Sequence, residues 1–172
     1  MLVKASREYA DEIASYREAF VSAGEPICGA GPLIRCSDID DWFRFTESLT
    51  REDTLPNGFV VSTQLFCIRK NDRRLVGTLQ IRHYFNDFLR LYGGNIGYSV
   101  RPDERRKGYA KTMLNESLSV CRSIGLESVL ITCEPRNEGS RRTIMSCGGV
   151  YESTVFCERD GVFLERYIIK LK

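Results

Sequence analysis

The residues Arg105–Ala110, Arg-Arg-Lys-Gly-Tyr-Ala, combine positive charge with a glycine at the predicted start of a helix. They follow an apolar strand predicted over residues 95–100, and the helix is predicted to run to about Ile124. The first N–H groups of a helix have no partner within it, and the helix dipole makes that end positive. Gly108 has no side chain, so an anion can approach the backbone closely. The segment therefore predicts a site for a phosphate or diphosphate group.

Two other interpretations of these basic residues were weighed. Arg105, Arg106 and Lys107 can form a solvated helix start, with Asp103 and Glu104 relieving part of their repulsion. Cations near a helix N-terminus oppose the dipole, so this arrangement is less favourable without an anion. A nucleic-acid surface formed by Arg90, Arg101, Arg105 and Arg106 is disfavoured because the formal net charge of the chain is only +2.

Cysteine and histidine give no pattern of metal ligands. The chain has seven cysteines and a single histidine, His83, and no Cys-x-x-Cys pair occurs. An odd number of cysteines, several of them within apolar runs, is typical of reduced and mostly buried thiols. We therefore expect no metal site, a structural role for His83 and a buried, non-nucleophilic Cys133.

Length and composition predict one globular domain over residues 1–172. Hydrophobic residues make up 42% and charged residues 28% of the sequence, which is ordinary for a soluble protein. No apolar stretch is long enough to cross a membrane, and the first residues carry no secretory pattern. We expect a cytoplasmic protein that binds neither membranes nor nucleic acid.

Hydrophobic periodicity and turn residues predict an α/β protein with the order β-α-α-β-β-β-α-β-α-β-β. Ser6 and Ser37 are the predicted N-caps of the first two helices, and Asn137 caps the last one. The strand, helix and strand in the middle predict a parallel pair with a right-handed crossover, within a mixed sheet covered by helices on both faces. The predicted strands are 1–5, 65–69, 75–83, 95–100, 127–133, 150–157 and 162–171.

With these elements in place, the chain resembles the GNAT superfamily of acyl-CoA-dependent N-acetyltransferases. The phosphate motif of that family matches Arg105-x-x-Gly108-x-Ala110, which follows the strand Ile96–Val100 and Pro102. The family's asparagine after the next strand, with a glycine eleven residues later, matches Asn137 and Gly148. The resemblance extends over the element order from about residue 2 to residue 171 and is closest to bacterial members whose acceptors are mostly unassigned.

The resemblance implies a GNAT-like fold in which the central parallel strands splay apart and acetyl-CoA, without a metal, enters the gap. The pantetheine arm would pair with the first of these strands, and the diphosphate would lie over the start of the following helix. The implied cofactor-binding residues are Tyr98, Ser99, Val100, Arg105, Arg106, Lys107, Gly108, Tyr109, Ala110, Lys111 and Asn137.

The implied reaction is direct attack of a primary amine on the thioester in a ternary complex. Positions where many members carry acidic or phenolic groups hold Gly94 or Asn95, Thr132 and Ile144 here. The remaining candidates for catalysis are Tyr98, Glu25 and Glu134. Tyr98 would supply a phenol as acid and a backbone N–H near the thioester carbonyl. The two glutamates would bind or deprotonate the amine, and for each a solvated surface carboxylate is the alternative.

The sequence leaves the acceptor open, as an amine on a small molecule or a protein. The missing acid and base residues keep a non-catalytic CoA-binding or sensing module as the alternative function. A nucleotide-binding domain ranks last because the turn lacks the Gly-Lys-Ser/Thr ending of a Walker loop. The last hairpin offers an edge through which two copies can pair, so a homodimer is possible.

Overall fold

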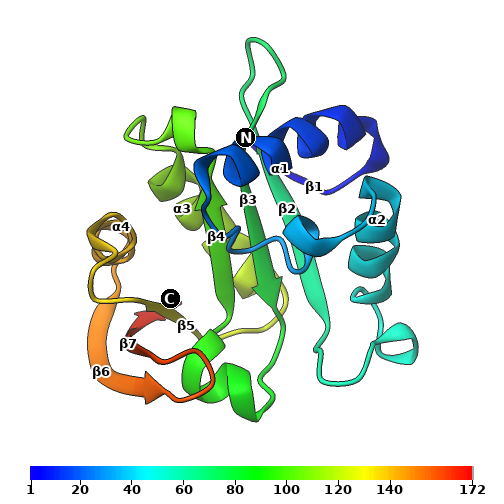
Figure 1. Cartoon of the computed structure of the whole chain (residues 1–172). Helices are drawn as coiled ribbons and strands as arrows, with labels where there is room; N and C mark the ends of the chain where they lie inside the picture. Colours follow the sequence, from blue (N-terminus) through cyan, green and yellow to red (C-terminus); the bar gives the residue numbers. More distant parts are fainter. Residues whose placement is uncertain (172) are drawn as a thin grey trace.

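Two antiparallel sheets lie side by side in the computed structural model, which describes residues 1–171 (Figure 1). The first sheet has the strand order β1-β2-β3-β4 and the second has the order β5-β7-β6. The strands are β1 (Leu2–Lys4), β2 (Ser62–Ile68), β3 (Leu75–Arg82), β4 (Ile96–Val100), β5 (Ser128–Cys133), β6 (Val150–Cys157) and β7 (Val162–Lys170). The order of elements along the chain is the predicted one, but the single mixed sheet is replaced by these two sheets.

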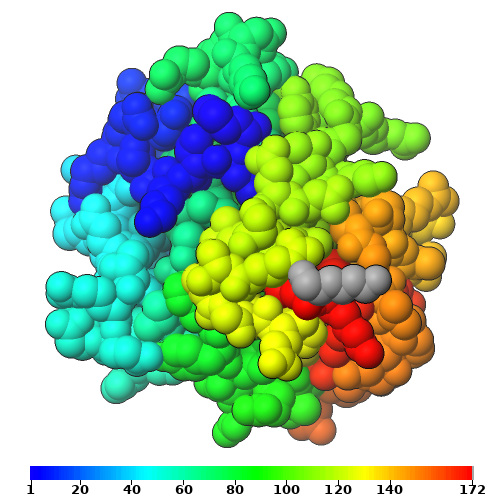
Figure 2. Space-filling view, turned by 180° about the vertical axis from the view of Figure 1, so that it is seen from behind, coloured from blue at the N-terminus to red at the C-terminus, as the bar shows by residue number. Residues whose placement is uncertain are grey.

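The α-helices are α1 (Ala10–Ala23), α2 (Ile39–Ser48), α3 (Tyr109–Ser123) and α4 (Glu138–Ser146). One element was not expected, a turn of π-helix at Leu89–Gly93, between the strands predicted over 75–83 and 95–100. The segment between α1 and α2 crosses in front of β3 and β4 (Figure 1). Figure 2 shows the opposite face, where α3 lies between the N-terminal segment and the C-terminal hairpin. No helix within residues 1–171 has the length and apolarity needed to cross a membrane.

The helix starts confirm one predicted cap and correct two others. The side chain of Asn137 accepts a hydrogen bond from the Ser140 N–H at 3.0 Å and caps α4 as predicted. At α2 the cap is Asp38, which accepts from the Asp41 N–H at 2.6 Å. Ser37 does not cap α2, because its hydroxyl donates to the Asp41 carboxylate instead. Ser6 likewise makes no cap bond and precedes a short 3-10 turn before α1.

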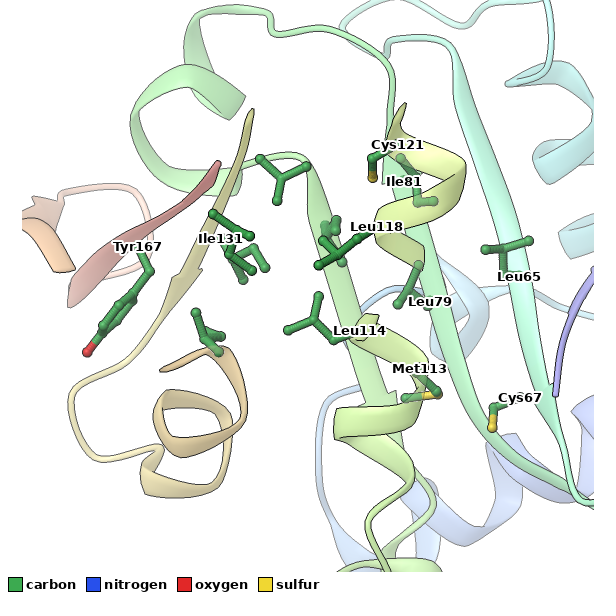
Figure 3. Close-up of a cluster of buried hydrophobic side chains, with 14 of the residues drawn as sticks. Leu65, Cys67, Leu79, Ile81, Met113, Leu114, Leu118, Cys121, Ile131 and Tyr167 are labelled. Carbon is green, nitrogen blue, oxygen red and sulfur yellow. The ribbon is translucent and has the colours of Figure 1, made fainter. Parts of the chain in front are cut away.

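One apolar core joins the two sheets through α3. Leu114 and Leu118 of α3 point into the space between β3 and β5, toward Leu79 and Ile131 (Figure 3). Leu114 and Leu79 are fully buried, and burying a leucine side chain contributes about 1.5–3 kcal/mol. Within the described residues no ladder of backbone hydrogen bonds joins the two sheets. Packing against α3 therefore holds them together on one face.

A single asparagine joins the two sheets at the point where β4 and β5 begin to separate. The Asn95 N–H donates to the Leu130 carbonyl at 2.7 Å, and the Asn95 Oδ1 accepts from the Leu130 N–H at 2.9 Å. On the other side, the Arg82 N–H donates to the Asn95 carbonyl at 2.8 Å, and the Asn95 Nδ2 donates to the Arg82 carbonyl at 3.2 Å. Asn95 is only 2% exposed. Beside it, a Cβ on Gly94 would lie 2.4 Å from the Leu130 carbonyl oxygen, so this junction requires a glycine.

Replacing Asn95 with alanine is expected to lower the free energy of unfolding by about 2–4 kcal/mol, because it leaves the Leu130 N–H and the Arg82 carbonyl buried without partners. Urea unfolding measures this change. Asn115→Ala on the exposed surface of α3 is the matched control and should stay within about 0.5 kcal/mol of the wild type. An Asn95 variant as stable as this control would contradict the structural role given to the side chain.

Candidate active site

A cavity of about 850 Å³ lies between the end of β4, the start of α3 and the start of α4. Every residue predicted to bind the cofactor or to act in catalysis lines this cavity, except Lys107. These lining residues are Glu25, Tyr98, Ser99, Val100, Arg105, Arg106, Gly108, Tyr109, Ala110, Lys111, Glu134 and Asn137. The structure therefore brings together residues that lie more than a hundred positions apart in the sequence.

The N-terminus of α3 presents free backbone amides to this cavity. Gly108 is the N-cap with a φ of 85°, and no side chain caps the helix. The first amide bonded within the helix is the Thr112 N–H, which donates to the Gly108 carbonyl at 3.1 Å. The N–H groups of Tyr109, Ala110 and Lys111 therefore have no intrahelical acceptor. Arg106 also has a positive φ, of 63°, and such strain in a non-glycine residue is common in ligand-binding turns.

A buried carboxylate holds this turn in place. Glu104 is only 2% exposed and accepts hydrogen bonds from Lys107 at 2.8 Å, Arg69 at 2.8 Å and Arg74 at 2.7 Å. The bond from Lys107, together with Arg69, lowers the pKa of Glu104 against the opposing effect of burial. Lys107 does not line the cavity, and its ammonium group bonds Glu104, which does. Lys107 thus stabilises the turn through Glu104.

Strand β4 offers backbone groups outside its ladder with β3 on the side that faces β5, where the Val100 carbonyl already accepts from the Arg105 Nε at 3.3 Å. The Arg82 N–H bonds the Asn95 carbonyl, and the Arg101 N–H bonds the Val76 carbonyl, so the odd-numbered residues of β4 pair with β3. Because bonding direction alternates along a strand, the N–H and C=O groups of Tyr98 and Val100 point away from β3. An extended ligand in the gap can pair with them in the manner of an added strand.

The Tyr98 side chain crosses from β4 to α4. Its hydroxyl lies 2.9 Å from the Ser140 hydroxyl, in the first turn of α4. Burial raises the pKa of Tyr98 well above its usual value, and the hydrogen bond with Ser140 only partly opposes that effect. The phenol is therefore protonated at neutral pH and is available as a proton donor at the wall of the cavity.

Glu25 and Arg105 form an ion pair across the mouth of the cavity. The Arg105 Nη1 donates to the Glu25 Oε1 at 3.1 Å, and a second bond joins the Nη2 to the other carboxylate oxygen. The hydrogen bonding to Arg105 lowers the pKa of Glu25. A carboxylate with a lowered pKa is a weaker base, so this geometry favours a binding role for Glu25 over amine deprotonation.

Replacing Glu25 with glutamine is expected to tighten acetyl-CoA binding by about 2–5-fold, because it frees Arg105 for the diphosphate and removes a negative charge from the cavity mouth. Calorimetry measures the affinity. Glu18→Gln on α1, whose exposed carboxylate pairs with Arg17, is the matched control and should leave the affinity unchanged. Weaker binding in the Glu25 variant would show that the carboxylate itself assists the cofactor.

Glu134 and Asn137 occupy the wall formed after β5. Glu134 lies directly after the strand and pairs with the exposed Arg136 at 2.6 Å. The Oδ1 atom of Asn137 accepts the capping hydrogen bond of α4. Its amide NH₂ group therefore remains as the donor available to a ligand. Both side chains therefore stand at the cavity wall with polar groups that a bound molecule can reach.

The three positions that lack the usual acidic or phenolic groups have structural roles. Asn95 joins the two sheets, as described above. The Thr132 hydroxyl donates to the Tyr92 carbonyl at 2.7 Å. Ile144, on α4, is fully buried in the core. None of the three side chains is free for proton transfer.

Several lining residues were not identified from the sequence. They come from the end of α1 and the segment after it, from the turn before α3, and from α4 and the turn before it. Ser140 alone carried a usable signal, because it lies three residues after the predicted cap Asn137, in the first turn of the helix. The residues missed are Phe20, Pro26, Cys28, Glu104, Arg136, Gly139, Ser140 and Thr143.

Comparison with known proteins agrees with this site. A family model for the acetyltransferase (GNAT) domain matches residues 5–150. The sequence has no significant match among curated proteins. Among solved structures, ribosomal-protein-S5-alanine acetyltransferase from Vibrio fischeri is similar with a TM-score of 0.73 and 15% identity, covering 99% of this chain and 92% of that one.

Two further similar structures contain the cofactor or its product. One is yncA, a putative acetyltransferase from Salmonella typhimurium with acetyl-CoA, which has a TM-score of 0.64 and 17% identity over 100% of this chain and 94% of that one. The other is spermidine N-acetyltransferase from Vibrio cholerae with CoA and spermine, with a TM-score of 0.64 and 16% identity over 99% and 95% of the two chains. At these identities the similarity establishes the fold.

Proposed function

The chain belongs to the GNAT acetyltransferase family, and from this premise we propose that it moves the acetyl group of acetyl-CoA directly to a primary amine in a ternary complex. The observation that supports the proposal is a cavity lined both by the free N–H groups at the start of α3 and by the edge of β4 that faces β5. The diphosphate lies over the N–H groups of Tyr109, Ala110 and Lys111, with Arg105 and Arg106 beside it. The pantetheine arm pairs with the N–H and C=O groups of Tyr98 and with the Val100 N–H, and the Asn137 amide also binds it.

In the proposed reaction the amine nitrogen forms a bond to the thioester carbonyl carbon, and the carbon–sulfur bond breaks. The Tyr98 N–H stabilises the negative charge that develops on the carbonyl oxygen. The Tyr98 phenol protonates the departing CoA thiolate and regains its proton from water, either directly or by relay through the Ser140 hydroxyl, which receives a proton from water as it gives one up. The amine loses its proton to Glu134 or to water at the same wall. Positioning of the two reactants supplies much of the rate, on the order of 7–11 kcal/mol at best.

The proposal is tested by following CoA thiol release from acetyl-CoA with a panel of primary amines. We expect turnover with at least one amine, together with a mass increase of one acetyl group on that amine. Calorimetric binding of acetyl-CoA without turnover on any amine would instead support the second candidate, a CoA-binding or sensing module. The positions of Asn95, Thr132 and Ile144 favour this second candidate, because the groups that many relatives use for proton transfer are missing there.

The similar structures suggest two kinds of amine acceptor for the panel. One is a polyamine, as in the spermidine acetyltransferase, and the other is an amine of a protein, as in the ribosomal-protein-S5-alanine acetyltransferase. A polyamine is a multiple cation, so its site requires several carboxylates. The cavity wall has three, Glu25, Glu104 and Glu134, and each already accepts from an arginine or lysine. Because these carboxylates are already paired, the described part of the cavity wall has no free negative charge to bind a polyamine, and a polyamine acceptor is disfavoured.

A further inference from the structure

Arg82 is the one partly buried arginine in residues 1–171 that has no carboxylate within salt-bridge distance. The structure gives every other arginine that is not exposed an acidic partner. Those arginines are Arg17, Arg69, Arg74, Arg101, Arg141 and Arg166. A guanidinium group keeps its charge in proteins, and a charge withdrawn from water is costly unless it is paired. The Arg82 guanidinium group therefore lacks an anionic partner, which a bound molecule can supply.

The guanidinium group of Arg82 uses only part of its hydrogen-bonding capacity. Its Nη1 atom donates to the carbonyls of Gly93 at 2.8 Å and Gly94 at 3.2 Å, at the junction of the two sheets. The described residues provide no acceptor for its Nη2 or Nε atoms. An arginine carries five N–H donors in a planar fork, so an edge of this fork is free to bind an oxyanion.

This free edge lies on the face of β4 that the segment between α1 and α2 covers. A Cβ placed on Gly97 would lie 3.3 Å from the Arg82 Nη2 and 3.2 Å from the Gly29 nitrogen. The missing side chain at Gly97 thus makes room for the guanidinium group beside the glycine-rich segment. Gly97 precedes Tyr98, whose N–H is the proposed donor to the thioester carbonyl. The guanidinium group therefore lies beside the residue that precedes the proposed oxyanion donor.

Cys28 connects this position to the cavity. Its carbonyl accepts from the Ser99 hydroxyl at 2.6 Å, and the residue lines the cavity together with Glu134. Burial raises the pKa of the Cys28 thiol, while the charge of Arg82 lowers it and the charge of Glu134 raises it. Glu134 lines this end of the cavity, whereas Arg82 stands outside the lining residues, beside Gly97 and close to Gly29. The two opposite charges match a molecule that has both an amine and an anionic group.

We propose that Arg82 binds an oxyanion carried by the acceptor, so that the substrate is an amine with a carboxylate or phosphate close to it, such as an amino acid. This proposal rests on the proposed acetyl transfer and specifies its acceptor. Arg82 would orient the acceptor and would take no part in proton transfer. The planar fork of a guanidinium group suits two-point binding of a carboxylate or a phosphate.

Matched acceptor pairs test the proposal by thiol release. L-tyrosine and L-histidine are compared with tyramine and histamine, which lack only the carboxylate, and phosphoethanolamine is compared with ethanolamine. We expect the wild type to prefer the anionic member of a pair by at least about ten-fold in kcat/KM, as loss of a charged hydrogen-bonded pair predicts. Arg82→Gln should abolish that preference mainly through KM, and Arg82→Lys should retain part of it. The pair that shows the preference distinguishes carboxylate from phosphate.

A preference for the neutral members, or an equal loss on both members in Arg82→Gln, would overturn the proposal. A second readout does not require turnover. Iodoacetate and iodoacetamide alkylate the same thiols but differ in charge, and peptide mapping gives their rate ratio at Cys28. The ratio should fall by about five-fold in Arg82→Gln and persist in Arg82→Lys, with Cys36 as the internal reference. An unchanged ratio at Cys28 would contradict the anion site even if no acceptor is acetylated, whereas failure of acetyl-CoA to bind would contradict only the proposed function.

Discussion

Replacing Gly108 with aspartate is expected to weaken acetyl-CoA binding by at least about 100-fold, the largest effect of any single change considered. The carboxylate would stand at the N-terminus of α3, beside the amides that bind the diphosphate, and would satisfy them in its place. It would also repel the negative cofactor. Space is not the obstacle, since a Cβ at Gly108 meets nothing within 4 Å.

The backbone conformation of Gly108 requires a matched control. Its φ of 85° is unfavourable for any other residue, at about 1–2 kcal/mol. Gly125, at the opposite end of α3, has a φ of 84° and equally open surroundings. Gly125→Asp therefore introduces the same residue and comparable strain away from the cavity. We expect both variants to lose similar stability and only Gly108→Asp to lose cofactor binding, as calorimetry can measure. Equal affinities in the two variants would contradict the assignment of the diphosphate site.

Replacing Tyr98 with phenylalanine is expected to lower kcat by about 100-fold, at the lower end of the range for loss of a general acid. The cofactor should still bind, because pairing with β4 uses backbone groups that the substitution leaves in place. Burial raises the pKa of the phenol above its usual value near 10. The protonated form is the active one and persists at every pH below that raised pKa. The wild-type kcat should therefore not fall on the alkaline side up to about pH 10.

Ser140→Ala distinguishes a catalytic role of the Tyr98 phenol from a role in packing alone. It removes the hydrogen-bond partner of Tyr98 while leaving the phenol in the cavity wall. We expect a smaller loss in kcat, of about 3–10-fold, as for one lost hydrogen bond. Single-turnover measurements at saturating acetyl-CoA give both rates. If Tyr98→Phe acetylates its acceptor at the wild-type rate, the thiolate leaves without help from the phenol.

Local patterns in the sequence predicted the elements and the cofactor end of the site. Helical spacing and strand alternation are local properties, so the order of elements was predicted correctly. The turn at Gly108 was identifiable because one short segment contains the strand end, the glycine and the helix start. Its residues and those of Tyr98–Val100 line the cavity, as expected. Lys107 differs because its ammonium group bonds Glu104, and nothing in the local sequence indicates that Glu104 is buried.

The parts that could not be predicted depend on contacts between distant residues. The junction of the two sheets rests on Asn95, whose backbone N–H bonds Leu130 in place of its β3 partner. The pairing of Glu25 with Arg105 joins residues eighty positions apart. Arg82 ends an ordinary strand, and its lack of an acidic partner is visible only in three dimensions. For the same reason the acceptor end of the site was the least predictable part.

The central claim is that the free amides at the start of α3 bind the diphosphate of acetyl-CoA. The most direct measurement is a titration of labelled protein with acetyl-CoA, followed through the amide resonances. Our account predicts that the resonances of Tyr109, Ala110 and Lys111 move most and that ADP, which carries the same diphosphate group, moves them in the same direction. Binding of acetyl-CoA that leaves these three resonances unmoved would contradict the claim.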